Sequence, residues 1–233
     1  MNYVFVSSKI SEEEEINLIK LKINPIKVPI SKKLPKEIWD HPDMLLNIIG
    51  QKNIIVHKDM DKSFTLFLSK LNYNIHFSDK ILKNKYPEDI ILNGLNLKDI
   101  FIHKLESTDP ALRSLVKGKK LINTKQGYSK CSTAVLSEEA FITSDDNIER
   151  ILLKEGKKVL KIPYGDIILD GYNYGFIGGC CGLIHPGVLA FYGDLNFYKY
   201  GDKVLKFLKE NKIQPVYLRK GKLIDRGSIL LSL

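Results

Sequence analysis

The chain has 233 residues, 44% of them hydrophobic and 27% charged, a balance that excludes an intrinsically disordered protein and suits a globular one. No stretch approaches the roughly 18 apolar residues of a membrane span, and the start of the chain, acidic over Glu12–Glu15, does not have the pattern of a secretory signal. We therefore expect a cytoplasmic protein with no membrane partner, and the sequence leaves its oligomeric state open.

Strand-like apolar segments with polar ends recur along the chain at intervals of 40 to 50 residues. Each is followed by a helix-like segment with a polar start and then by another short strand, and Gly156 is placed to end the fourth helix. A further strand precedes every recurring segment except the first. The recurring segments lie at 4–8, 54–58, 100–104, 140–146 and 189–194, the strands after the helices at 26–30, 74–78, 120–124, 158–163 and 214–218, and the preceding strands at 44–50, 90–95, 131–136 and 180–184.

One stretch of sequence is written twice. Asp43–Lys58 aligns without a gap to Asp89–Lys104, with seven of sixteen positions identical, which indicates a supersecondary unit used repeatedly. The repeat pairs Asp43 with Asp89 and Asn47 with Asn93. We expect each aspartate to share one face of an inner strand with the asparagine that follows it, and a cap of the strand-entry turn is the alternative for the two aspartates. The repeat also pairs His57 with His103 at the end of the second strand, where a structural role in a turn is favoured over a metal site.

The two ends of the chain complete one unit between them. The first unit lacks a preceding strand, whereas Gly227–Leu233 is a strand with no helix after it. The sequence therefore predicts an α/β protein of five ββαβ units, closed into a ring by its terminal strands. A doubly wound open sheet is the alternative, but it leaves the last strand unexplained. We expect one domain over residues 1–233, with units at 227–233 plus 1–31, 41–79, 88–125, 129–163 and 177–219.

Two segments and one arrangement resemble a known fold. The five-unit ring resembles the penteins (the α/β propeller of guanidino-group-modifying enzymes), which include dimethylarginine dimethylaminohydrolases, arginine and agmatine deiminases and amidinotransferases. Gly127–Leu136 is similar to their histidine-bearing segment, and Asp225–Leu231 to the last strand, which carries their nucleophilic cysteine. The whole chain is similar to an uncharacterised clostridial-type family of this fold, through the segments His41–Asp43, Gly127–Cys131 and Gly171–Gly179.

The departures from the pentein pattern bear on function. The resemblance implies attack of a thiolate on a guanidinium carbon, with a histidine as acid and carboxylates holding the cation. Here Tyr128 or Ser129 occupies the histidine slot, and Gly227 occupies the nucleophile slot. We therefore expect a small-molecule site in the central channel, for a guanidino or amino compound, without ordinary hydrolase chemistry. If the protein is an enzyme, it is a hydrolase or transferase of C–N bonds that uses a displaced cysteine.

A macromolecular partner is the alternative function, by analogy with the ribosome anti-association factor that shares the five-unit ring. The formal net charge of +9 favours it, but only four of the 36 basic residues are arginines. Arginine is the residue that base and phosphate recognition prefers, and scattered lysines are more typical of a solvated surface. A nucleic-acid partner is therefore only weakly indicated.

The candidate site residues stand near the starts of the presumed inner strands. Cys131 and Cys180 are the candidate nucleophiles, with a small buried thiol as the alternative for each, and His41 or Lys130 is placed to lower a thiol pKa. The glycine- and aromatic-rich Asp170–Gly179 is either a pocket wall or a plain connection. No metal or nucleotide motif is present, so neither a metal nor a cofactor is expected. The expected ligand-binding residues are Asp43, Asn47, Asp89, Asn93, Lys130, Asp225 and Arg226.

Overall fold

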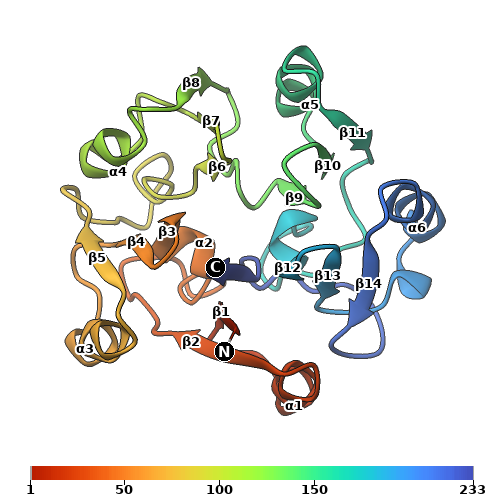
Figure 1. Cartoon of the computed structure of the whole chain (residues 1–233), viewed down its shortest axis with the longest axis horizontal. Helices are drawn as coiled ribbons and strands as arrows, with labels where there is room; N and C mark the ends of the chain where they lie inside the picture. Colours follow the sequence, from red (N-terminus) through yellow and green to blue (C-terminus); the bar gives the residue numbers. More distant parts are fainter. Residues whose placement is uncertain (1, 233) are drawn as a thin grey trace.

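Five small sheets of three strands follow one another along the chain in this computed structural model, which describes residues 2–232. In every sheet the central strand lies antiparallel to one neighbour and parallel to the other, and the parallel neighbour is the strand that follows it in the chain. Figure 1 shows the sheets arranged around a common centre, with the longer helices at the periphery. The expected α/β fold of five ββαβ units is confirmed.

The first sheet joins both ends of the chain. Strand β1 (Asn2–Ser7) lies between β2 (Ile23–Val28) and β15 (Leu230–Ser232). The pairing of β1 with β15 is antiparallel, with Phe5 opposite Leu230, as the unpartnered last strand predicts. Helix α1 (Glu12–Lys20) connects β1 to β2, and the Ser11 side chain caps its first turn.

The other four units repeat the same order of elements, and Gly156 follows the last turn of α5 with a positive φ of 75°, as predicted. The second unit contains α2 (Pro42–Leu45), β3 (Leu46–Gly50), β4 (Asn53–Val56), α3 (Lys62–Lys70) and β5 (Asn74–Phe77). The third contains β6 (Leu95–Asn96), β7 (Ile100–His103), α4 (Pro110–Leu115) and β8 (Lys120–Asn123). The fourth contains β9 (Thr133–Val135), β10 (Ala140–Thr143), α5 (Asp146–Lys154) and β11 (Lys158–Lys161). The fifth contains η1 (Gly178–Cys180), β12 (Cys181–His185), β13 (Val188–Phe191), η2 (Leu195–Phe197), α6 (Gly201–Glu210) and β14 (Gln214–Tyr217).

The inner strand of the second unit begins later than the sequence suggests. Pro42 favours the first turn of a helix, and Pro42–Leu45 forms α2 before β3 starts at Leu46. The expectation that Asp43 and Asn47 share one face of a strand is therefore wrong. Asp43 lies in helix α2, which directly precedes the strand β3 that carries Asn47.

The internal repeat is also out of register on the inner strand of the third unit. Asn47 lies opposite Ile55 in the second unit, and Asn96 lies opposite Phe101, the residue that aligns with Ile55 in the repeat. The structural counterpart of Asn47 is therefore Asn96, three residues beyond the expected Asn93. Gly94 makes this shift possible, because a Cβ at that position would overlap the ring of Phe101.

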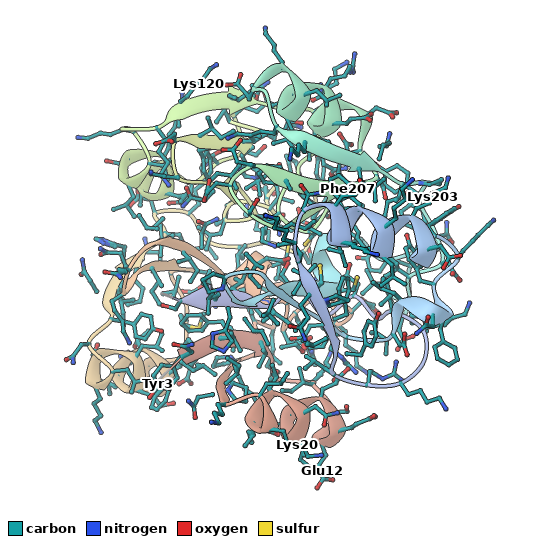
Figure 2. The ribbon with its side chains drawn as sticks, turned by 45° about the vertical axis from the view of Figure 1, so that its right-hand side comes forward. Tyr3, Glu12, Lys20, Lys120, Lys203 and Phe207 are labelled. Atoms are coloured by element: carbon teal, nitrogen blue, oxygen red, sulfur yellow. The ribbon has the colours of Figure 1, made fainter. Side chains whose placement is uncertain are left out.

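The apolar core fills the space between the units as well as the space under the helices. The largest cluster of buried residues includes Phe5, Leu46, Leu92 and Cys131, which come from four different units. The exposed lysines Lys20, Lys120 and Lys203 point outward from three units in Figure 2. Among the described residues, no helix is both long and apolar enough to cross a membrane.

The two histidines that align in the repeat are buried structural residues. Burial lowers the pKa of both His57 and His103 to about 4. The ring nitrogens of His103 lie 2.8 Å from the Thr108 hydroxyl and 3.1 Å from the Gly127 carbonyl oxygen. This ring therefore ties the end of β7 to the two loops that follow it.

We expect His103 to make the protein less stable in mild acid. Its pKa is lower in the folded state than in the unfolded one, so only the unfolded chain takes up a proton between about pH 6.5 and pH 4. Stability is full above this window and is lost as the pH falls through it, by up to about 3 kcal/mol. Urea unfolding at several pH values, compared with His103→Gln, measures the effect. An equal pH dependence in both proteins contradicts it.

Candidate functional site

A pocket of about 240 Å³ opens where the second and fourth units and the connection between the fourth and fifth units meet the segment before the last strand. Its walls are mainly aromatic and aliphatic. The polar side chains at its base are those of His41, Cys131 and Asp225, three of the residues that the sequence marks as candidates. The other lining residues are Ile38, Met44, Tyr128, Leu169, Tyr172, Asn173, Tyr174 and Phe176.

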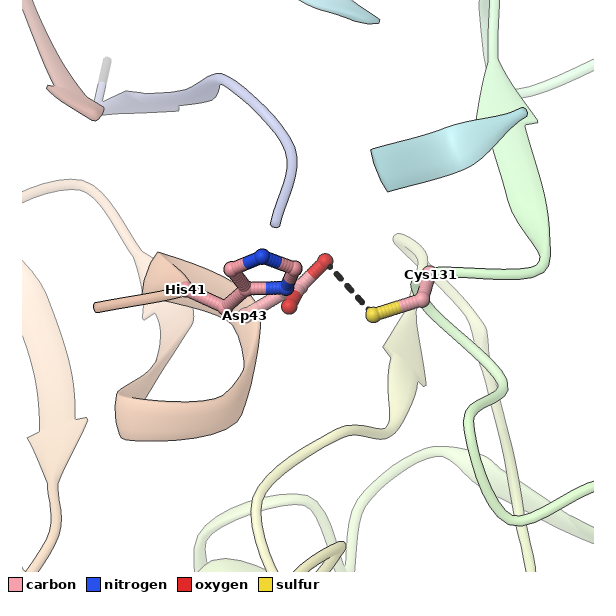
Figure 3. Close-up of side chains that lie close together, drawn as sticks. All are labelled: His41, Asp43 and Cys131. Carbon is pink, nitrogen blue, oxygen red and sulfur yellow. Dashed lines mark hydrogen bonds between the residues drawn. The ribbon is translucent and has the colours of Figure 1, made fainter. Parts of the chain in front are cut away.

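Asp43 and Cys131 are in direct contact beneath this pocket. The Cys131 thiol donates a hydrogen bond of 3.0 Å to Asp43 Oδ2, drawn in Figure 3. The Ser228 hydroxyl donates to the same oxygen at 2.5 Å. The other oxygen, Asp43 Oδ1, is buried and has no hydrogen-bond partner in the described part of the chain. Ligand atoms of His41, Asp43 and Cys131 all lie within 4.8 Å of one another.

Asn93 holds the two sides of this contact together. Its side-chain oxygen accepts hydrogen bonds from the backbone N–H of Lys130 (3.0 Å) and of Cys131 (3.3 Å). Its amide nitrogen donates to the Asp43 carbonyl oxygen at 3.0 Å and to Cys131 Sγ at 3.2 Å. Asn93 is fully buried, so it fixes the position of the thiol rather than facing a ligand.

Asp225 lies in a space that glycines leave open. Its carboxylate accepts hydrogen bonds from the backbone N–H of Phe176 (2.8 Å) and of Gly227 (3.0 Å). Burial raises its pKa, and Asp43 adds to that effect, while His41, 3.8 Å away, opposes it. A Cβ at Gly175 or Gly179 would overlap this carboxylic side chain. These glycines therefore let Asp170–Gly179 close over Asp225 and bring Tyr172, Tyr174 and Phe176 to the pocket.

The two candidate nucleophiles differ in their access to the pocket. Cys131 lines it, but burial and the neighbouring Asp43 and Asp225 carboxylates raise the pKa of its thiol well above the ordinary value. Cys180 does not line the pocket, its Sγ lies 3.1 Å from the Ile177 carbonyl oxygen, and burial raises its pKa as well. A thiol with a raised pKa is a poor nucleophile at neutral pH.

The remaining predicted ligand residues make internal contacts. Asp89 accepts a 2.6 Å hydrogen bond from the Tyr128 hydroxyl, and Asn47 donates to the Leu92 and Gly94 carbonyl oxygens at 3.0 and 2.9 Å. Lys130 Nζ donates to Ser228 Oγ at 3.0 Å, and Arg226 pairs with Glu14 at 3.0 Å. Asp43 and Asp89 therefore contact different groups, although the repeat relates them.

The positions at which the sequence departs from the pentein pattern have different surroundings. Tyr128 lines the pocket, whereas the Ser129 hydroxyl donates to the Gln126 carbonyl oxygen at 2.8 Å. Gly227 has a positive φ of 72°, and a Cβ there would overlap His41. His41 therefore occupies the space beside Gly227.

Some pocket residues carry no sequence signal as candidates. Ile38, Met44 and Leu169 line the pocket, but they read as ordinary core residues. Ser228 stands in the last-strand segment, but nothing in the sequence connects its hydroxyl with Asp43. The glycine and aromatic density of Asp170–Gly179 is the one pattern that could have identified a pocket wall, and the structure places its three aromatic side chains there.

Comparison with known proteins supports the fold. A sequence model described as a family of unknown function (DUF6873) matches residues 5–230. No curated protein matches the chain significantly. Solved structures do match in shape, although their sequences are only distantly similar.

An inosamine-phosphate amidinotransferase from Streptomyces griseus matches with a TM-score of 0.61 and 12% identity, over 99% of this chain and 93% of that one. An agmatine deiminase from C. jejuni with substrate bound matches with a TM-score of 0.56 and 11% identity, over 98% and 92%. A dimethylarginine dimethylaminohydrolase from Pseudomonas aeruginosa in complex with citrulline matches with a TM-score of 0.53 and 8% identity, over 92% and 91%. These similarities show the pentein fold; the likeness to a clostridial-type family stays a prediction.

Proposed function

We propose that this chain, which belongs to the family of unknown function DUF6873 and has the pentein fold, binds a small compound with a guanidino or amino group. The ligand would enter the pocket above Asp225, in the centre of the five units. The observation that carries this proposal is a buried carboxylate at the base of an aromatic-walled pocket.

The charges around the pocket favour a cation. Asp43 and Asp225 are 1% and 4% exposed, and His41 is the only basic side chain among the residues that line this pocket. Two carboxylates in a poorly solvated site are costly to keep ionised without a positive partner. A guanidinium or ammonium group beside Asp225 would supply that charge, and it would lower the carboxyl pKa that burial has raised.

The walls suit the same kind of ligand. Tyr128, Tyr174 and Phe176 stand close together, with ring centroids 6.0 and 6.2 Å apart for the two pairs that include Phe176. The face of an aromatic ring attracts a cation within about 6 Å. Of the similar structures, the agmatine deiminase holds its substrate and the dimethylarginine dimethylaminohydrolase holds citrulline, and these compounds motivate the guanidino class proposed here.

The site favours binding over ordinary pentein catalysis. Cleavage of a C–N bond would have to use Cys131, the one thiol that lines the pocket. This thiol donates to Asp43 and has a raised pKa, so it is held in its protonated form. The alternative, a macromolecular partner, rests on the net charge of +9 and on the fold analogy.

We expect Asp225→Asn to weaken binding of the cationic ligand at least about tenfold, since loss of one buried charge contact is worth about 1.4 kcal/mol or more. Arginine, methylarginine and agmatine are titrated into the protein by calorimetry, and the same mixtures are assayed for citrulline, urea and released amine. Asp202→Asn is the matched control, because it removes an exposed aspartate at the start of α6.

Two results would refute this proposal. One is that none of the three compounds binds the wild-type protein. The other is that Asp225→Asn binds them as tightly as Asp202→Asn does. If the wild type converts one of these compounds and Asp225→Asn still binds that compound as tightly as the wild type does, turnover takes place at another site.

A further inference from the structure

We propose that His41, Asp43 and Cys131 form a binding site for a transition-metal ion, with Zn²⁺ as the best fit. The inference goes beyond the binding of an organic cation, because the metal would use Asp43 and leave Asp225 to the pocket. The three residues come from the start of α2 and from the loop before β9, so no sequence motif could indicate the site.

The donor set and its geometry suit zinc. Zn²⁺ takes nitrogen, oxygen and sulfur ligands at about 2.0–2.3 Å in a tetrahedral arrangement, which places the ligand atoms about 3.3–3.8 Å apart. The ligand atoms here lie within 4.8 Å of one another, so side-chain movements of about 1 Å would bring them to these distances. The three residues are 3%, 1% and 3% exposed, and soft sulfur in the set disfavours Mg²⁺ and Ca²⁺.

One atom of the site points independently to a cation. Within residues 2–232, Asp43 Oδ1 is buried without a hydrogen-bond partner, while Oδ2 accepts from Cys131 and from Ser228. Ten buried side-chain atoms of these residues have no hydrogen-bond partner, and Asp43 Oδ1 is the one that belongs to a cluster of possible metal ligands. A metal ion coordinated by this carboxylate would remove that deficit.

The surroundings already orient two of the ligands. The Asn93 amide nitrogen donates to Cys131 Sγ at 3.2 Å, and the Ser228 hydroxyl donates to Asp43 Oδ2 at 2.5 Å. Groups that hydrogen-bond to a metal ligand without contacting the metal itself fix the position of that ligand. They are in place here before any metal binds.

Charge and protons balance when the ion binds. The Cys131 thiol releases its proton to solvent, and the resulting thiolate, the Asp43 carboxylate and neutral His41 together carry two negative charges against two positive ones. Three protein ligands leave the fourth position of a tetrahedral ion open. Because His41 and Cys131 line the pocket, a water or ligand atom could bind there.

The test uses Co²⁺ as a spectroscopic probe on the full-length, metal-free protein. We expect one Co²⁺ per chain, with tetrahedral absorption bands and a thiolate charge-transfer band that Zn²⁺ abolishes by competition. Cys131→Ser should remove the charge-transfer band and weaken Co²⁺ binding roughly 100-fold or more. His41→Gln should weaken binding to a similar extent while keeping the thiolate.

Matched variants distinguish this site from metal binding elsewhere on the chain. The sulfur of Cys181 contacts the Ile177 carbonyl oxygen, so Cys181→Ser should keep the full spectrum. Asp225→Asn should keep the charge-transfer band while it loses the guanidino ligand, so failure of the two proposals can be told apart. The metal proposal is overturned if the wild type shows no charge-transfer band, or if that band survives in Cys131→Ser. If Cys131→Ser does not fold, the metal proposal is overturned when His41→Gln binds Co²⁺ as tightly as the wild type does.

Discussion

Gly227→Ala is expected to destabilise the protein by about 3 kcal/mol or more. The residue has a φ of 72°, a left-handed conformation that costs a non-glycine residue roughly 1–2 kcal/mol. A Cβ at this position would also overlap the Cα and Cβ atoms of His41, and overpacking of a buried site costs roughly 1–3 kcal/mol more. Urea unfolding monitored by circular dichroism measures the loss.

Gly156→Ala separates the two causes. Gly156 has nearly the same φ, 75°, but a Cβ there would meet no atom within 4 Å. This control should therefore show only the backbone cost, well below that of Gly227→Ala. Equal losses in the two variants would contradict the overlap with His41.

The same overlap bears on larger side chains at position 227. The Cβ of a cysteine there would need the space that His41 occupies, so we expect Gly227→Cys to be destabilised at least as much as Gly227→Ala.

Local patterns were sufficient to predict most of the fold. The recurring strand–helix–strand segments gave five units, and the unpartnered last strand indicated its pairing with β1. The same patterns failed on the inner strands of the second and third units. There Pro42 starts a helix, and the ring of Phe101 passes over Gly94, so the preference of proline for a helix start delayed one strand and packing delayed the other.

The candidate site was harder to predict, because sequence identity does not report contacts between units. The repeat makes Asp43 and Asp89 equivalent, yet Asp43 contacts Cys131 and Asp89 contacts Tyr128. Asn93 was expected to line a channel and instead holds Cys131 in place. Residue type indicated which side chains were unusual, and only the structure showed which of them meet.

Asn93→Leu is expected to destabilise the protein by about 3 kcal/mol or more. The substitution keeps a similar volume but leaves the Cys131 backbone N–H and the Asp43 carbonyl oxygen without their present side-chain partner. Each buried polar group left unsatisfied costs roughly 1–3 kcal/mol. The backbone N–H of Lys130 is less affected, because it also donates to the Asn93 carbonyl oxygen at 3.1 Å. Urea unfolding at neutral pH gives the loss directly.

Asn74→Leu is the matched control for this prediction. Asn74 lies exposed on β5, where its amide donates to the Asn53 side chain at 2.7 Å, and exposed substitutions of this kind change stability by about 0.5 kcal/mol or less. Asn93→Leu should also weaken the proposed metal site, because the amide that orients the thiol is lost. A variant as stable as Asn74→Leu would show that Asn93 does not hold the second and fourth units together. In that case the burial of Cys131 among apolar neighbours, rather than this hydrogen-bonded amide, would position the thiol beneath the pocket.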